Sequence, residues 1–104
     1  MANYIVIFTT CPSAKEARNI AAALLDRRFV ACANIVSPVE SRFWWKGKKN
    51  SAKEALLILK ARKANFSKIE KAIRRIHSYS VPEIIALPVV SGSRDYLKWI
   101  DENA

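Results

Sequence analysis

The chain of 104 residues has little glycine, histidine or cysteine, and each shortage excludes a class of protein. Two glycines are too few for the glycine-rich loops that cradle phosphates in nucleotide-binding proteins. A single histidine, His77, excludes a histidine-rich metal site within one chain. Cys11 and Cys32 form neither a CxxC motif nor a disulfide framework, so we expect no zinc ribbon and no secreted stapled fold. Two free thiols suit a reducing compartment and predict a cytoplasmic protein.

Long apolar runs are lacking as well. The N-terminal run at 5–8 is too short for a signal-peptide core or a membrane span, so we expect no membrane partner. The composition is nevertheless 51% hydrophobic, which is enough for the core of a single domain over residues 1–104. So short a chain buries only about two-thirds of its unfolded surface, and association with further copies would add stability.

Apolar periodicity predicts the order strand, helix, strand, strand, helix, strand, with a short helix at the end. The predicted strands are 4–10, 30–45, 55–59 and 83–90, and residues 46–51 are the predicted turn of a long hairpin. Ser13 and Glu16 fit a capping box for a helix over 13–28. Ser93 is the expected N-cap of the last helix. Pro38 predicts a bulge or an unpaired edge position.

The second helix is expected to begin at Asn65 or Ser67, and its apolar residues recur at helical spacing. This stripe consists of Phe66, Ile69, Ile73 and Ile76. Two right-handed crossovers joined by a hairpin predict an α+β fold, the ferredoxin-like βαββαβ sandwich with two helices on one face of one sheet. The strand at 55–59 is apolar on both faces, so we expect a second copy of the chain to cover the face without helices.

Five short segments carry a further inference. They are Thr10-Cys11-Pro12, the Ala-Cys-Ala-Asn-Ile run at 31–35, Trp-Trp-Lys-Gly-Lys at 44–48, Pro-Glu-Ile-Ile-Ala-Leu-Pro-Val at 82–89, and Tyr-Leu-Lys-Trp-Ile at 96–100. Together and in this order they resemble the CutA family of divalent-cation-tolerance proteins. The resemblance implies a non-enzymatic homotrimer similar to PII-type signalling proteins, which bind small ligands in clefts between subunits.

The chain departs from the family pattern at several positions. Ser78 stands where the family often has proline, and Lys46 stands where glutamate is usual. Some copper-associated members carry a cysteine matching Thr9 and a second histidine matching Ile76. Both of those copper ligands are missing here.

Two candidate sites follow from the residues and the resemblance. The first is a soft-metal site for Cu²⁺ or another divalent cation, formed by Cys11, Cys32 and His77, because thiolate and imidazole suit copper or zinc. The alternative is that both cysteines are small buried core residues. The second is a ligand cleft, which the family arrangement places between subunits near His77. Its candidate residues are Thr9, Cys32, Lys60, Tyr79, Glu83 and Trp99.

Two groups of side chains suggest contacts rather than chemistry. Glu83 would need a cationic partner if buried, and Lys60 is the candidate. Phe43, Trp44 and Trp45 are the predicted trimer interface, because aromatic residues are enriched in subunit interfaces. The alternative for the tryptophans, stacking on nucleic-acid bases beside lysines, is less consistent with their opposite orientations on a strand. No catalytic constellation is present, so we expect no enzyme.

The net charge of +9 lies almost wholly in residues 42–75, which hold 12 basic and 2 acidic residues. These residues cover the hairpin tip and the polar face of the second helix, and they predict a basic surface open to an acidic partner. A nucleic-acid-binding module is the alternative. The predicted central strand lacks the aromatic platform of an RNA-recognition module, so nucleic acid is not the expected partner.

The basic surface predicts only weak, nonspecific attraction to nucleic acid. Any affinity measured by fluorescence anisotropy should fall steeply between low and physiological salt and show no sequence preference, because phosphate contacts release counterions. Salt-resistant, sequence-specific binding would contradict this interpretation.

Overall fold

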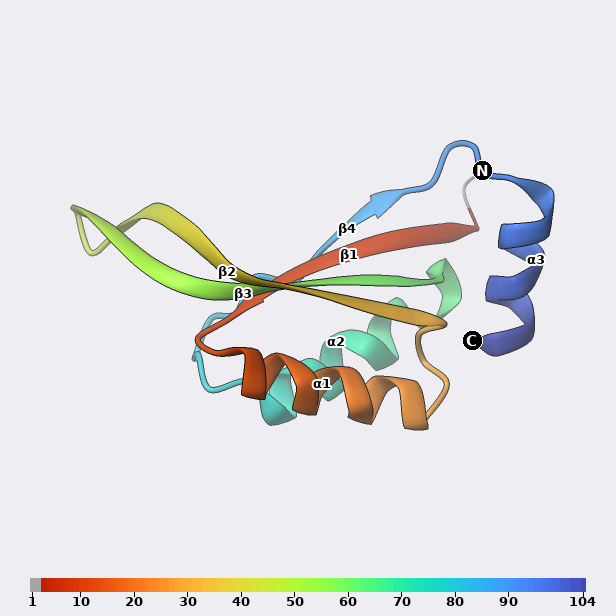
Figure 1. Cartoon of the computed structure of the whole chain (residues 1–104), viewed down its shortest axis with the longest axis horizontal. Coiled ribbons are helices and arrows are strands. Elements are labelled where there is room, and N and C mark those ends of the chain that lie inside the picture. Colours follow the sequence, from red (N-terminus) through yellow and green to blue (C-terminus); the bar gives the residue numbers. More distant parts are fainter. Residues whose placement is uncertain (1–2) are drawn as a thin grey trace.

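A four-stranded antiparallel sheet with strand order β2-β3-β1-β4 organises the chain in the computed structural model, which describes residues 3–104. Helices α1 and α2 cover one face of this sheet, and α3 packs beyond the strand ends (Figure 1). The predicted ferredoxin-like α+β sandwich is therefore confirmed, with its long hairpin and terminal helix. The elements are β1 (Tyr4–Cys11), α1 (Ala14–Asp26), β2 (Cys32–Trp45), β3 (Lys48–Arg62), the 3₁₀ turn η1 (Lys63–Asn65), α2 (Phe66–Ile76), β4 (Ile85–Pro88) and α3 (Arg94–Asn103).

At the N-terminus of α1, only one of the two side-chain hydrogen bonds of the predicted capping box forms. The Ser13 hydroxyl accepts a hydrogen bond from the backbone N–H of Glu16 at 3.2 Å. The Glu16 carboxylate accepts hydrogen bonds from the backbone N–H and the hydroxyl of Ser78 at 3.1 and 3.2 Å. Glu16 thus links the start of α1 to the loop that follows α2.

The hairpin turn is shorter than predicted and consists of Lys46 and Gly47 alone. Their φ angles are 51° and 76°, and two positive φ values at the central positions are those of a type I′ turn. β3 therefore begins at Lys48 and not at Ala55. The segment 48–54 was missed because this arm projects from the body of the protein, so its strand residues lack an apolar alternation (Figure 1).

The predicted bulge and the strands β2 and β4 are present, and both strands are shorter than predicted. The pairing of β2 with β3 shifts between Val36 and Val39, around the cis peptide bond at Pro38, which confirms the predicted bulge. β2 begins at Cys32 rather than residue 30, because its pairing with β3 starts at Cys32 and Lys60. Val30 lies in the core ahead of the strand. β4 is an edge strand and covers only 85–88 of the predicted 83–90.

The core lies between the sheet and helices α1 and α2. Leu57 and Leu59 from β3 are fully buried against Ile20, Leu24 and the α2 residues of the apolar stripe. Ile76, the last residue of that stripe, is 37% exposed where α2 ends, so the predicted stripe is one residue too long. No helix within residues 3–104 has the length and apolar character needed to cross a membrane.

Ile73 and Ile76 offer a matched pair for testing this core. We expect Ile73→Ala to lower the free energy of unfolding by about 2–5 kcal/mol, because Ile73 is fully buried and its truncation leaves a cavity. Ile76→Ala should cost less than about 1 kcal/mol. Urea unfolding followed by circular dichroism at one protein concentration measures both, and equal losses would contradict the assigned core.

Candidate metal and ligand sites

Three side chains that suit a metal ion meet where β1, α1 and α2 end or begin. Cys11 is the last residue of β1, Glu16 lies in the first turn of α1, and His77 is the C-cap of α2. One ligand atom from each lies within 4.8 Å of the other two, an arrangement that we call the Cys–Glu–His cluster. Cys11 is fully buried and His77 is 8% exposed.

Hydrogen bonds set the form of the His77 ring. Nε2 lies 2.7 Å from the carbonyl oxygen of Thr10, which can only accept, so Nε2 carries a proton. The backbone N–H of Tyr79 donates to Nδ1 at 3.1 Å, so Nδ1 holds a lone pair. Both ring nitrogens of His77 are therefore engaged by backbone groups. Its Nδ1 atom also lies 3.4 Å from the Glu16 carboxylate.

Cys11 is a protonated thiol at neutral pH. Burial, reinforced by the negative charges of Glu16 and Glu54, raises the pKa of the Cys11 thiol to about 11. A metal ion binds the thiolate, so ion binding at this cluster must displace the thiol proton.

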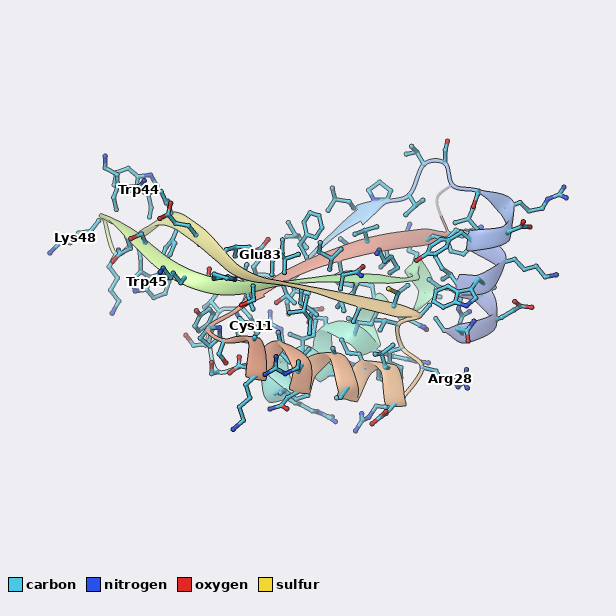
Figure 2. All side chains as sticks on the ribbon, viewed as in Figure 1. Cys11, Arg28, Trp44, Trp45, Lys48 and Glu83 are labelled. Atoms are coloured by element: carbon cyan, nitrogen blue, oxygen red, sulfur yellow. The ribbon has the colours of Figure 1, made fainter. Side chains whose placement is uncertain are left out.

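A cavity of about 820 Å³ opens beside the Cys–Glu–His cluster, between the hairpin, from Glu54 up to Trp45, and the loop at 78–83. We call it the hairpin cavity. Glu54, a buried residue of β3, accepts a hydrogen bond from the Tyr79 hydroxyl at 2.8 Å within this lining. Burial and this bond raise the pKa of Tyr79 to about 12. Glu83 lies near the base of the hairpin, and its carboxylate accepts a hydrogen bond from the Thr10 hydroxyl at 3.4 Å (Figure 2).

A second polar group lies at the opposite end of the sheet, beside α3. Asn34 accepts hydrogen bonds from the Lys60 ammonium and from the Cys32 thiol, the latter at 3.7 Å. Tyr96 packs on Trp99 with ring centroids 5.5 Å apart. Burial, followed by the neighbouring Cys32 thiol, raises the pKa of Tyr96.

The structure brings together only part of each predicted site within one chain. Cys11 pairs with Ala55 and Cys32 pairs with Lys60, so the two cysteines lie about 16 Å apart along β3. His77 lies with Cys11, and Glu16 takes the place predicted for Cys32. Metal binding by any of these residues stays a prediction.

The candidate residues of the predicted ligand cleft also lie in different parts of the chain's surface and core. Tyr79 and Glu83 line the hairpin cavity, whereas Cys32, Lys60 and Trp99 belong to the distant group beside α3. Thr9 lies on neither surface. It is fully buried on the helix-covered face of β1, and its hydroxyl has no hydrogen-bond partner within residues 3–104.

The predicted Lys60–Glu83 ion pair is wrong within one chain. Glu83 is exposed, and Lys60 donates to Asn34 instead. The premise of a buried Glu83 fails because Glu83 leads into the edge strand β4, whose residues are all exposed. Glu83 lies beside Thr10, whereas Lys60 pairs with Val6 farther along β1.

Two functional candidates were missed from the sequence, Glu16 and Glu54. Glu16 was missed because the sequence already explained it as a capping residue. Its closeness to His77 is a tertiary contact that the spacing of the residues does not show. The available signal for Glu54 was its position as an acidic residue directly before the apolar run at 55–59.

The comparisons with known proteins agree with this architecture. Residues 5–103 match the family described as CutA1 divalent ion tolerance protein. The divalent-cation tolerance protein CutA of Archaeoglobus fulgidus is 42% identical over 96 residues, which are 92% of this chain and 93% of that protein. Its counterpart from Thermus thermophilus is 42% identical over 98 residues, which are 94% of this chain and 95% of the relative.

Solved structures show the same fold. CutA1 from the psychrotrophic bacterium Shewanella sp. SIB1 superposes with a TM-score of 0.95 at 36% identity, covering 99% of this chain and 96% of that one. The A. fulgidus structure, described as a periplasmic divalent cation tolerance protein, has a TM-score of 0.93 at 40% identity and covers 96% and 97% of the two chains. The match over residues 5–103 and the 42% identity to nearly full-length relatives show that this chain belongs to the CutA1 divalent ion tolerance family.

Proposed function

We propose that the protein is a cytoplasmic homotrimer that contributes to divalent-cation tolerance by binding a divalent ion at the Cys–Glu–His cluster. The observation that carries this proposal is the convergence of three ligand atoms within 4.8 Å. The function is binding rather than catalysis. The two free thiols support the cytoplasmic location, although the A. fulgidus relative is described as periplasmic.

The donor set suits copper or zinc. Thiolate and imidazole favour these borderline and soft ions over Mg²⁺ or Ca²⁺, and a carboxylate can complete a site with three protein ligands. Nε2 of His77 donates to the Thr10 carbonyl, the outer bond by which proteins commonly orient a metal-binding histidine. Nδ1 would bind the ion and would give up its hydrogen bond from the Tyr79 backbone.

Exposed apolar side chains support the homotrimer. Phe43, Trp44 and Trp45 are 41%, 70% and 53% exposed on the projecting hairpin. Ile85 and Leu87 of β4 are 50% and 43% exposed as well. Apolar surface of this extent on a small domain is typical of a protein–protein interface. Trp44 and Trp45 lie toward the tip of the hairpin (Figure 2).

Attraction of an acidic partner is the second candidate function. On α2, the cations Lys68, Lys71 and Arg75 are exposed, and none forms an ion pair with a carboxylate of the described residues. A solvated basic face of this kind steers negatively charged molecules through long-range attraction.

Metal binding at the cluster should strengthen as pH rises. Because the pKa of Cys11 is about 11, one thiol proton must leave at neutral pH, and we expect Zn²⁺ affinity to increase about tenfold per unit between pH 7 and 9. Isothermal titration calorimetry in buffers of different ionisation enthalpy counts the released proton. Co²⁺ should give a thiolate-to-metal absorption band.

Cysteine substitutions provide the matched controls for the metal site. Cys11→Ser should abolish the Co²⁺ thiolate band and the proton release, whereas Cys32→Ser should leave both unchanged. Absence of Zn²⁺ binding to the native protein, or loss of the band in Cys32→Ser alone, would refute the assigned site.

The oligomeric state is open to direct measurement. Light scattering should give about 35 kDa, three times the chain mass of 11.8 kDa. Trp44→Asp should shift the protein toward smaller species, because it places a charge in the proposed interface. Leu25→Asp, at an exposed apolar residue of α1, should keep the trimer mass. A monomeric native protein would contradict the proposal.

A further inference from the structure

A group of cations without carboxylate partners extends along α2 to the end of α1. Lys68, Lys71 and Arg75 recur at three- and four-residue spacing, so they share one side of α2. Arg27 and Arg28 follow directly after α1. All five residues are exposed, and none forms an ion pair with a carboxylate of residues 3–104. We call these five residues the basic helix face.

The ring of Phe29 brings cations of the two helices together at one end of this face. It packs on the core, with the guanidinium carbon of Arg27 at 6.0 Å and the ammonium of Lys68 at 5.9 Å from the ring centroid. Cations at such distances are attracted to an aromatic ring. Phe29 therefore keeps two like charges close together although they repel each other.

The helix dipoles explain only part of this charge. Arg27 and Arg75 lie at helix C-termini, where a cation is favoured. Lys68 instead lies in the first turn of α2, where acidic residues are favoured and none is present. Arg28 has a φ of 56°, in the left-handed region that glycine adopts with less strain. Both residues are structurally unfavourable, which a binding role for their charges explains.

The basic helix face stays open in the proposed homotrimer. α1 and α2 cover one face of the sheet, and the opposite face is the one that a second copy would cover (Figure 1). Figure 2 shows Arg28 at the end of α1, at the opposite end of the molecule from Trp44 and Trp45. A partner can therefore reach the basic helix face without displacing a subunit.

We propose that the basic helix face docks an acidic segment of another protein, an extended stretch with carboxylates on alternate residues. The helical rise places Lys71 and Arg75 about 6 Å apart along α2. Alternate side chains of an extended chain are about 6.6 Å apart, so successive carboxylates can meet successive cations. This inference deepens the second candidate function and rests on it, and it does not depend on metal binding.

The chemistry of the face favours a protein partner over the other anionic surfaces. Binding to a bilayer requires apolar side chains that project beside the cations. Stacking on nucleic-acid bases requires an open aromatic ring. Phe29 is the ring of this face, and it packs on the core rather than projecting. Charge pairing alone is left, and side-chain carboxylates supply it.

An acidic peptide tests the proposal. The probe is a fluorescently labelled peptide of about ten alternating glutamate and serine residues, and the neutral control peptide has glutamine in place of glutamate. In fluorescence anisotropy at physiological salt, we expect the native protein to bind the acidic peptide about tenfold or more tightly than the neutral one. Binding of neither peptide would overturn both the docking surface and the second candidate function.

Two charge reversals provide the matched comparison, because both residues are exposed lysines on helices. Lys71→Glu should weaken binding of the acidic peptide about fivefold or more. Lys98→Glu, on α3, makes the same change in net charge and should weaken binding less than about twofold. Equal losses would show long-range attraction alone, so the second candidate function would stand and the docking surface would fall.

Arg28→Gly separates binding from folding. We expect it to weaken binding of the acidic peptide while the urea midpoint stays the same or rises, because glycine relieves the unfavourable φ. An affinity equal to that of the native protein would overturn the assigned surface.

Other anionic probes decide between partners. Tighter binding of the native protein to duplex DNA or to vesicles of anionic phospholipid than to the acidic peptide, at the same salt, would overturn a protein partner. Lys71→Glu should keep the Co²⁺ thiolate band of the native protein, so failure of the docking surface is distinguishable from failure of the metal site.

Discussion

The antiparallel pairing of β3 with both of its neighbours is the constraint on which the rest of the molecule depends. β3 pairs with the whole length of β1, and it pairs with β2 along most of the length of β3. This register places Cys11 at one end of the body and Cys32 at the other. A slip of this register by one residue would turn every side chain of a strand to the opposite face of the sheet. The Cys–Glu–His cluster and the polar group beside α3 therefore stay separate within one chain.

The loop after α2 connects the two sites that lie near the hairpin. His77 contributes to the Cys–Glu–His cluster through its ring, and Tyr79 contributes to the hairpin cavity through its hydroxyl. The Tyr79 backbone donates to the His77 ring, so one hydrogen bond links the cluster to the lining of the cavity. Glu16 fixes this loop further through its bonds to Ser78.

Sequence reasoning recovered the elements better than the sites. The apolar, β-branched run of β1 and the Ser13 and Ser93 caps are local signals, and the structure confirms them. The polar arm of β3 was missed because its residues carry no apolar period outside the body of the protein. The Lys60–Glu83 pair failed because strand register places Glu83 beside Thr10 and Lys60 beside Val6, and the sequence does not define that register.

The sequence by itself determined the element order, the family and the concentration of positive charge in residues 42–75. These properties depend on periodicity, on short motifs and on composition, all of which are local along the chain. Only the tertiary structure decided which groups meet. In it, Glu16 lies beside Cys11 and His77, Glu54 is buried beside Tyr79, and Cys32 lies at the far end of the sheet. The physical reason is that such contacts depend on strand register and on the way the helices pack, and neither leaves a signal in the spacing of these residues.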